Sequence, residues 1–239
     1  MVELFNDGGP LMYALLLAAV IAIAVVFERF VVLHRVPSQS KAEKQLRDVE
    51  DALDEGGLEA CAQKVAKGKG VLNYVFARLL KRFDTLAMEK REIDKRKKVS
   101  SEVKKDSVAE FLMNQSEMSE FRDELLIVID DASKSYVTRF LPVLNTVGNV
   151  SPLLGLLGTI TGMIIAFESI ALSGTGDPKV VADGISQALI TTATGLIIAI
   201  PTIIFYRYLG GKADSSRTDI EAFAISFSNT LLSLLEKEE

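Results

Sequence analysis

The sequence is poor in the residues that build most catalytic and metal sites. Among its 239 residues there is one cysteine, Cys61, one histidine, His34, and no tryptophan. A single cysteine excludes an internal disulfide and a CxxC metal site, and a single histidine excludes a histidine cluster for zinc. The net charge is −5, so the strongly basic composition of a protein that binds nucleic acid over its whole surface is also missing.

Charged residues are missing from several long stretches of the chain. A quarter of the residues are charged, yet the mean hydropathy is +0.26, so the charged and apolar residues must be segregated. Three stretches are apolar over the roughly 20 residues that a transmembrane helix needs. They are residues 10–33, with no charge before Glu28, residues 142–167, with none at all, and residues 184–209, with none before Arg207.

We interpret all three stretches as membrane spans. The first could instead be a cleaved signal peptide, but acidic residues precede it and its apolar core is longer than that of a signal peptide. Two consecutive uncharged stretches of this length are also unusual for the core of a soluble protein.

The basic residues orient the spans. Of the 27 lysines and arginines, 21 lie between Arg35 and Arg139, whereas the link between the second and third spans holds only Lys179. The positive-inside rule therefore places the long segment and the C-terminus in the cytoplasm and the N-terminus outside. The predicted regions are an outer N-terminus (1–9), a cytoplasmic helical domain (34–141), an outer loop (168–183) and a cytoplasmic C-terminal helix (210–239).

The cytoplasmic segments have the pattern of packed helices. Residues 38–141 contain no proline, and Asp51–Gly57 and Gly68–Gly70 predict two turns. Residues 136–141 are apolar again, so we expect this helix to continue without a break into the second span. Apolar residues at helical spacing predict buried faces at Leu72, Val75, Phe76, Leu79, Leu80 and Phe83, and at Ile220, Phe223, Phe227 and Leu231.

A dense basic run, KREIDKRKKVSSEVKKD, occupies residues 90–106. Such a run could bind nucleic acid or anionic lipid, or it could be a solvated helix face. Acidic residues interrupt it and no aromatic residues alternate with the basic ones, so we favour the solvated face and predict no nucleic-acid partner.

Small residues form a stripe along each of the last two spans. Helices associate in lipid through close packing and hydrogen bonds, which small residues permit. The two stripes could pack on one another within one subunit or could line a pore, and the sequence leaves both open. The residues assigned to helix packing or pore lining are Gly155, Gly158 and Gly162 in the second span and Ala188, Gly195 and Ala199 in the third.

Polar uncharged side chains accompany these stripes. Thr159 lies in the middle of the second span, and Gln187, Thr191 and Thr192 lie in the outer half of the third. A group of this kind fits a polar path, and it equally fits hydrogen bonds that hold helices together.

No ionisable residue lies in the middle of any span. Glu28 and Arg29 are neighbours near the membrane edge of the first span. Intramembrane ionisable groups usually mark proton relays. If this protein moves protons, the titrating carboxylate must therefore come from a partner.

At these residues the sequence resembles the MotA/TolQ/ExbB proton channel family, on its ExbB/TolQ-like branch. The matching motifs are GGPLMYALLL followed by ER in the first span, LNTVGNVSPLLGLLGTITGMIIAF in the second and ADGISQALITTATGLIIAIPTIIFY in the third. With the three spans and the large cytoplasmic segment they cover essentially the whole chain. Only residues 84–120 look particular to this sequence.

The resemblance implies an all-α integral membrane protein of the bacterial inner membrane, with three transmembrane helices, long cytoplasmic helical extensions and a periplasmic N-terminus. It implies a homopentamer around two copies of a single-span partner similar to ExbD or TolR, which supplies an intramembrane aspartate. The subunit would be a pore-forming stator without enzymatic activity or cofactor. It would couple proton motive force to movement of the partner for energised envelope work or transport.

The resemblance also suggests roles for particular residues. It aligns Thr159 and Thr192 with the pore threonines of the family, and it implies that Gln187 and Thr191 lie near the entrance. Gln187 departs from the family pattern, which typically has a glutamate there. Because hard cations favour neutral and anionic oxygen ligands, sodium coupling, with Na⁺ near Gln187 and Thr191, is a second hypothesis.

A rival function from another class is a non-conducting membrane scaffold whose cytoplasmic helices recruit partner proteins. The sequence does not support an enzymatic function, because it has no glycine-rich phosphate loop, no cluster of metal ligands and no paired nucleophile and base.

Overall fold

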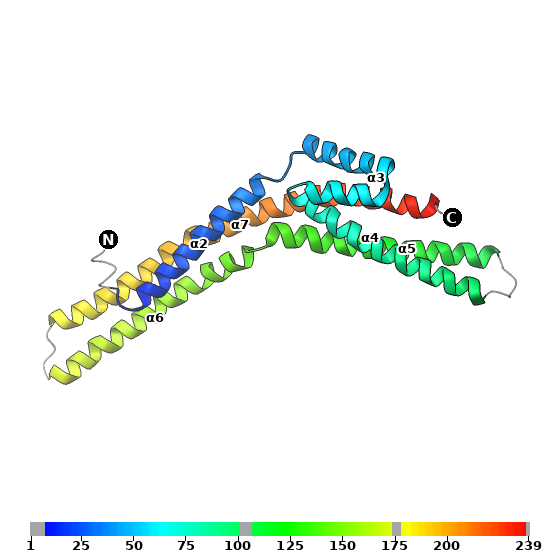
Figure 1. The fold of residues 1–239 in the computed structure, drawn as a ribbon. Coiled ribbons are helices and arrows are strands. Elements are labelled where there is room, and N and C mark those ends of the chain that lie inside the picture. Colours follow the sequence, from blue (N-terminus) through cyan, green and yellow to red (C-terminus); the bar gives the residue numbers. More distant parts are fainter. Residues whose placement is uncertain (1–7, 101–106, 174–177, 238–239) are drawn as a thin grey trace. The chain divides into compact units, whose positions relative to one another are not determined.

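The computed structural model describes residues 8–100, 107–173 and 178–237, and the regular structure in these residues is helical. The helices are α2 (Leu11–His34), α3 (Gln39–Lys67), α4 (Val71–Ser100), α5 (Ser107–Thr138), α6 (Leu141–Ser173) and α7 (Pro178–Lys237) (Figure 1). They form two compact units. Met1–His34 with Thr138–Ala213 form one, called here the apolar unit, and Arg35–Val137 with Asp214–Glu239 form the other, called the charged unit.

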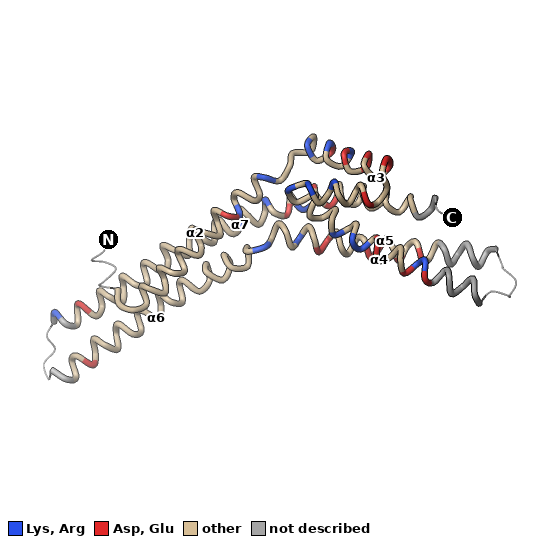
Figure 2. Tube along the Cα trace, viewed as in Figure 1, with Lys and Arg blue, Asp and Glu red and all other residues tan. Residues whose placement is uncertain are grey.

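The apolar unit contains α2, α6 and the first part of α7. The candidate membrane spans are Leu11–His34, Leu141–Ala171 and a stretch within Val181–Leu234, and Figure 2 shows few charged residues along these helices. Large apolar side chains face outward, with Phe27 71% and Ile197 70% exposed. Water is a poor solvent for such a surface, so lipid or other helices must cover it. The predicted helical fold with three candidate spans is confirmed.

The expected continuous helix through residues 136–141 is wrong. α5 ends at Thr138, and α6 begins only at Leu141. Between them Phe140 has a left-handed backbone with φ +73°, and its carbonyl oxygen accepts a hydrogen bond from the Val143 N–H at 3.1 Å. The cause is Pro142, which in a continuous helix could not donate to the Thr138 carbonyl and would clash with it.

The two turns expected in the charged unit are both present, but the first is narrower than predicted. α3 continues through residues 51–56 and departs from helical geometry only at Gly57, where φ is +68°. Gly68–Gly70 separates α3 from α4, and the Gly68 N–H caps α3 by donating to the carbonyl oxygens of Lys64 and Val65, both at 3.2 Å. Glycine tolerates the positive φ at residue 57 because it has no Cβ.

The apolar faces predicted for the charged unit form its core, except that Phe223 of the α7 face is only half-buried. All six residues of the predicted α4 face are at most 7% exposed, and the ring of Phe76 lies 4.7 Å from that of Phe227 in α7. Ion pairs connect different helices at the surface: Arg82 of α4 bonds Glu124 of α5, and Arg217 of α7 bonds Asp130 of α5. Arg217 also bonds Glu221 within α7.

Four of the regions predicted from the sequence fall partly outside the described residues. They are the outer N-terminus (residues 1–7 not described), the basic run (101–106), the outer loop (174–177) and the C-terminal helix (238–239). Residues 90–100 of that run belong to α4. The solvated-face interpretation therefore stays a prediction.

Candidate functional site

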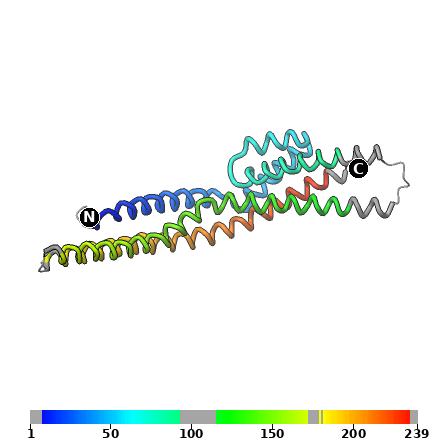
Figure 3. The backbone as a smooth tube through the Cα atoms, turned by 90° about the horizontal axis from the view of Figure 1, so that it is seen from below, coloured from blue at the N-terminus to red at the C-terminus, as the bar shows by residue number. Residues whose placement is uncertain are grey.

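Helices α6 and α7 lie side by side along the apolar unit (Figures 1 and 3), and two glycines allow their backbones to meet. A Cβ added to Gly155 would lie 3.0 Å from the Cα of Thr192, and one added to Gly195 would lie 2.6 Å from the carbonyl oxygen of Ser151. These neighbours are backbone atoms that cannot rotate away. The contact between α6 and α7, called the seam below, therefore requires glycine at both positions.

The seam continues toward the start of α7. A Cβ on Gly158 would meet Cγ2 of Thr191 at 2.4 Å, and one on Gly162 would meet Cβ of Ala188 at 2.9 Å. A Cβ on Gly184 would meet the side chain of Ala166 at 2.7 Å. The small-residue stripes of α6 and α7 thus pack on one another within one subunit, which is one of the two alternatives that the sequence left open.

All six residues assigned to helix packing or pore lining are buried: Gly155, Gly158, Gly162, Ala188, Gly195 and Ala199. Ser151, a further member of the small-residue stripe of the second span, is also fully buried, and its hydroxyl donates to the Val147 carbonyl at 2.7 Å.

Thr192 forms a hydrogen bond across the seam. Its hydroxyl oxygen lies 2.8 Å from the carbonyl oxygen of Gly155 and 3.2 Å from that of Ala188 in its own helix. The bond to Gly155 joins a polar side chain of α7 to the backbone of α6. Hydrogen bonds of this kind hold helices together in an apolar environment.

Thr159, the other predicted pore threonine, lies at the margin of the seam. It is half-buried, and its hydroxyl donates to the Leu156 carbonyl of its own helix at 2.6 Å. The two threonines therefore differ in role within the subunit: Thr192 connects two helices, whereas the hydroxyl of Thr159 bonds within one. Thr192 is also in close contact with Gly155.

Thr191 and Gln187 meet the segment that precedes α2. Thr191 is 1% exposed, and its hydroxyl oxygen lies 2.8 Å from the carbonyl oxygen of Gly8 and 2.9 Å from that of Gln187. A hydroxyl has one proton, so the two carbonyls share it. Gly8 is a functional candidate that the sequence analysis missed, and its only sequence signal was the GGP motif.

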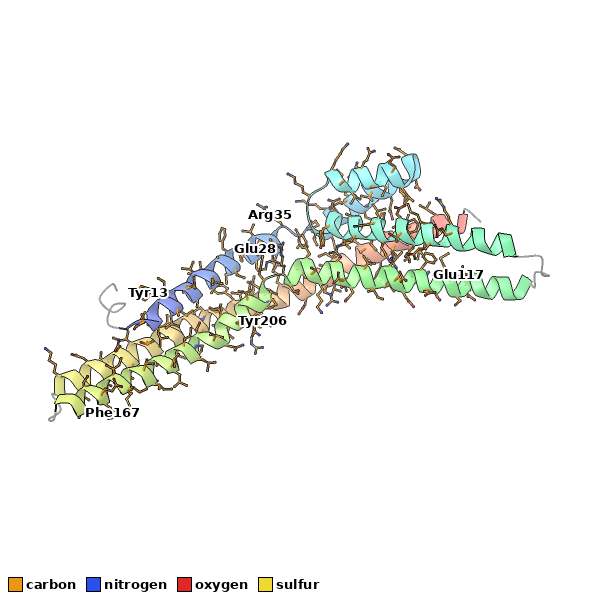
Figure 4. The ribbon with its side chains drawn as sticks, turned by 60° about the horizontal axis from the view of Figure 1, so that its bottom comes forward. Tyr13, Glu28, Arg35, Glu117, Phe167 and Tyr206 are labelled. Carbon is orange, nitrogen blue, oxygen red and sulfur yellow. The ribbon has the colours of Figure 1, made fainter. Side chains whose placement is uncertain are left out.

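Glu28 and Arg29 form a charged cluster near the end of α2, where Figure 4 labels Glu28. The Arg29 guanidinium donates to both carboxylate oxygens of Glu28, at 2.5 and 2.6 Å, and is 2% exposed. It also lies 5.5 Å from the ring centre of Phe140, and the Arg139 guanidinium lies 5.0 Å from the same ring. Cation–π attraction to Phe140, which lies between α5 and α6, thus adds to the ion pair of Arg29 with Glu28.

The described residues contain no group of three His, Cys, Asp or Glu side chains placed to hold a metal ion. What the seam offers instead is a row of hydroxyl and backbone oxygens between two apolar helices. Such an arrangement can hold helices together, and it can exchange its hydrogen bonds with water or a passing ion.

Comparison with known proteins identifies relatives of this chain. The sequence profile of the MotA/TolQ/ExbB proton channel family matches residues 95–222. A biopolymer transport ExbB homologue of Methanothermobacter thermautotrophicus is 26% identical over 219 residues, which are 92% of this chain and 66% of the relative. The biopolymer transport protein ExbB of Helicobacter pylori is 40% identical over 84 residues, 35% of this chain and 58% of the relative. The Tol-Pal system protein TolQ of Haemophilus influenzae is 38% identical over 90 residues, 38% of this chain and 40% of the relative. The chain thus spans at most 66% of the length of these three relatives.

Proposed function

This chain belongs to the MotA/TolQ/ExbB proton channel family, on its ExbB/TolQ-like branch, and we propose that it is the pore-forming stator subunit of an ion-driven motor in the bacterial inner membrane. In this proposal the subunit couples proton motive force to movement of a single-span ExbD/TolR-like partner for energised envelope work or transport. It has an N-terminus in the periplasm and a C-terminus in the cytoplasm, and it acts without catalysing a chemical reaction.

The observation that carries the proposal is the missing intramembrane carboxylate. Residues 142–167 hold no charged residue, and residues 184–209 hold none before Arg207. A proton channel needs a group that binds and releases protons within the membrane. In a proton channel family, a subunit without such a group must work with a partner that has one, and we assign an intramembrane aspartate to that partner.

The exposed apolar surface supports an oligomer. Several large side chains of α6 and α7 point away from the seam, among them Leu153, Phe167 and Ile204, each more than 60% exposed. Five subunits arranged in a ring would cover part of this surface and leave a central pore for two partner helices. Lipid would cover the rest.

Within that pore we assign the ion path to Thr159 and Thr192. Their hydroxyls lie beside the seam, and each donates a hydrogen bond to a backbone carbonyl oxygen. Each hydroxyl can therefore form a hydrogen bond with a water molecule in place of that carbonyl. The glycines of the seam keep α6 and α7 close together at Thr192.

The experiment is proton flux in proteoliposomes that contain this chain and a co-expressed single-span protein with an intramembrane aspartate. We expect flux with both proteins and none with this chain alone. The double variant Thr159→Val, Thr192→Val should abolish flux while the complex still assembles. Thr202→Val is the matched control, since Thr202 is buried in α7 and its hydroxyl bonds only the Ile198 carbonyl of its own helix, at 2.7 Å.

The same assay separates the rival functions. A complex that assembles but conducts nothing would favour the non-conducting scaffold. Flux measured at a fixed proton gradient with and without sodium tests the sodium hypothesis, and sodium-independent flux would eliminate it. The oxygens of Gly8, Gln187 and Thr191 lie at hydrogen-bond distances of 2.8 and 2.9 Å, so a sodium ion would have to separate them in order to bind.

A further inference from the structure

The function proposed above gives no role to Gly8–Gly9–Pro10, the segment that begins the GGPLMY motif and is called the strap here. The strap lies against α7. Gly8 is buried, and its carbonyl oxygen lies 2.8 Å from the hydroxyl of Thr191, which is 183 residues away in the sequence. A hydrogen bond buried among apolar helices is maintained because neither group has water as an alternative partner.

The backbone of the strap favours glycine at residue 9 and lies against α7 there. Gly9 has φ +73°, and a Cβ there would lie 2.4 Å from Nε2 of Gln187. A Cβ on Gly8 would lie 2.4 Å from Cγ of Met12, which belongs to α2. The positive φ at Gly9 favours glycine because glycine has no Cβ.

The strap also forms the first turn of α2. The Met12 N–H donates to the Gly9 carbonyl at 3.1 Å, and the Tyr13 N–H donates to the Pro10 carbonyl at 3.2 Å. α2 in turn packs on α6, and α6 is joined to α7 at the seam. The strap therefore completes a closed connection among the three helices of the apolar unit.

A cavity of about 230 Å³ borders the strap. Gly8, Pro10 and Leu11 form one side, and Leu157, Gly158, Thr161 and Gln187 are among the residues of the other sides. Gly158 is itself part of the seam. Displacement of the strap would enlarge this cavity and expose the seam at Gly158 to water.

We propose that the strap is a latch, and that Thr191 and Gln187 are positioning residues that hold it against α7 and exclude water from the seam at Gly158. This assignment replaces the entrance role that the sequence suggested for both residues. It rests on the proposed function for one consequence only, namely that the seam it shields contains the Thr192 hydroxyl assigned to the ion path.

The test is hydrogen–deuterium exchange of the full-length protein in nanodiscs, read from the peptide that contains Met12 and Tyr13. Thr191→Val keeps the shape of the side chain and removes the hydroxyl, so we expect exchange about three- to tenfold faster, as the loss of one buried hydrogen bond allows. Thr191→Ser should exchange like the wild type. Thr194→Val is the control, because the Thr194 hydroxyl donates to the Ile190 carbonyl in its own helix at 2.8 Å. Unchanged exchange in Thr191→Val, or equal acceleration in Thr194→Val, would overturn the latch.

A second pair of variants tests the glycine contact. Gly9→Ala should speed exchange of the same peptide, because alanine is strained at φ +73° and its Cβ would lie 2.4 Å from Nε2 of Gln187. Gly57→Ala is the matched control, since Gly57 also has a positive φ but no atom lies within 4 Å of its added Cβ. Equal acceleration by Gly57→Ala, or no acceleration by Gly9→Ala, contradicts the proposed contact.

The flux assay keeps this proposal separate from the proposed function. If the wild-type complex conducts and Thr191→Val leaves exchange unchanged, the latch fails while the proposed function stands. If the wild-type complex conducts nothing, the proposed function fails, and the exchange measurements still decide whether the latch exists.

Discussion

The hydroxyl of Thr192 in α7 lies 2.8 Å from the carbonyl oxygen of Gly155 in α6 and donates a hydrogen bond to it. The contact is possible because Gly155 has no Cβ, which would lie 3.0 Å from the Cα of Thr192. Thr192, assigned to the ion path, and Gly155, assigned to packing, are therefore in direct contact. Any water or ion that uses the Thr192 hydroxyl must compete with this bond.

We predict that Thr192→Val lowers the free energy of unfolding by about 1 kcal/mol, the usual contribution of one hydrogen bond between membrane helices. Thr192→Ser keeps the hydroxyl and should lose less than half of that amount. Denaturant unfolding of the purified protein in detergent measures both. Equal losses in the two variants would mean that the methyl group, and not the hydroxyl, contributes the stability.

We predict that Gly195→Ala destabilises the apolar unit by about 1–3 kcal/mol, as overpacking does in a close-packed interior. The added Cβ would lie 2.6 Å from the carbonyl oxygen of Ser151, so α6 and α7 must move apart. Gly210→Ala is the control within the same helix, because nothing lies within 4 Å of its added Cβ.

This control should itself be neutral or stabilising, by up to about 1 kcal/mol, since alanine favours a helix more than glycine does. Thermal unfolding in detergent compares the two variants. A stabilised Gly195→Ala variant would contradict the close approach of the two helices at this position.

We predict that Arg29→Met destabilises the protein by about 1–3 kcal/mol. The Arg29 side chain is 3% exposed, and its loss leaves the Glu28 carboxylate without its bidentate partner; the effect is below that of a fully buried ion pair because Glu28 is 40% exposed. Arg47→Met is the control, since the Arg47–Glu43 pair is 72% and 55% exposed and should contribute less than about 0.5 kcal/mol. Denaturant unfolding of the two variants should differ clearly, and equal stabilities would show that the Arg29 cluster is dispensable.

We predict that Cys61 makes stability depend on alkaline pH. Burial raises the pKa of the Cys61 thiol from 9.0 to about 11. The folded state therefore favours the neutral thiol, and its contribution is complete below pH 9 and is lost as the pH rises from 9 to 11, by at most about 3 kcal/mol. The stability difference between the wild type and Cys61→Ala, measured by denaturant unfolding from pH 8 to 11, should shrink over this interval. A constant difference contradicts the prediction.

Much of the architecture follows from local properties of the sequence. Uncharged stretches identify the three candidate spans, and apolar residues at helical spacing identify the buried face of α4, including Phe76 and Phe83. The break before α6 could also have been predicted from the sequence, because Pro142 prevents a continuous helix there. The apolar character of residues 136–141 instead favoured a continuous helix, although a proline follows them.

The sequence by itself determined that this protein has three apolar spans and no carboxylate in the middle of any of them, because hydropathy and charge belong to individual residues and their neighbours. Only the tertiary structure decided that the stripe of α6 packs on the stripe of α7 within one subunit, and that Thr191 holds Gly8. Neither contact has a local signal. Each depends on which faces two distant helices turn toward one another, and packing over the whole unit sets that register.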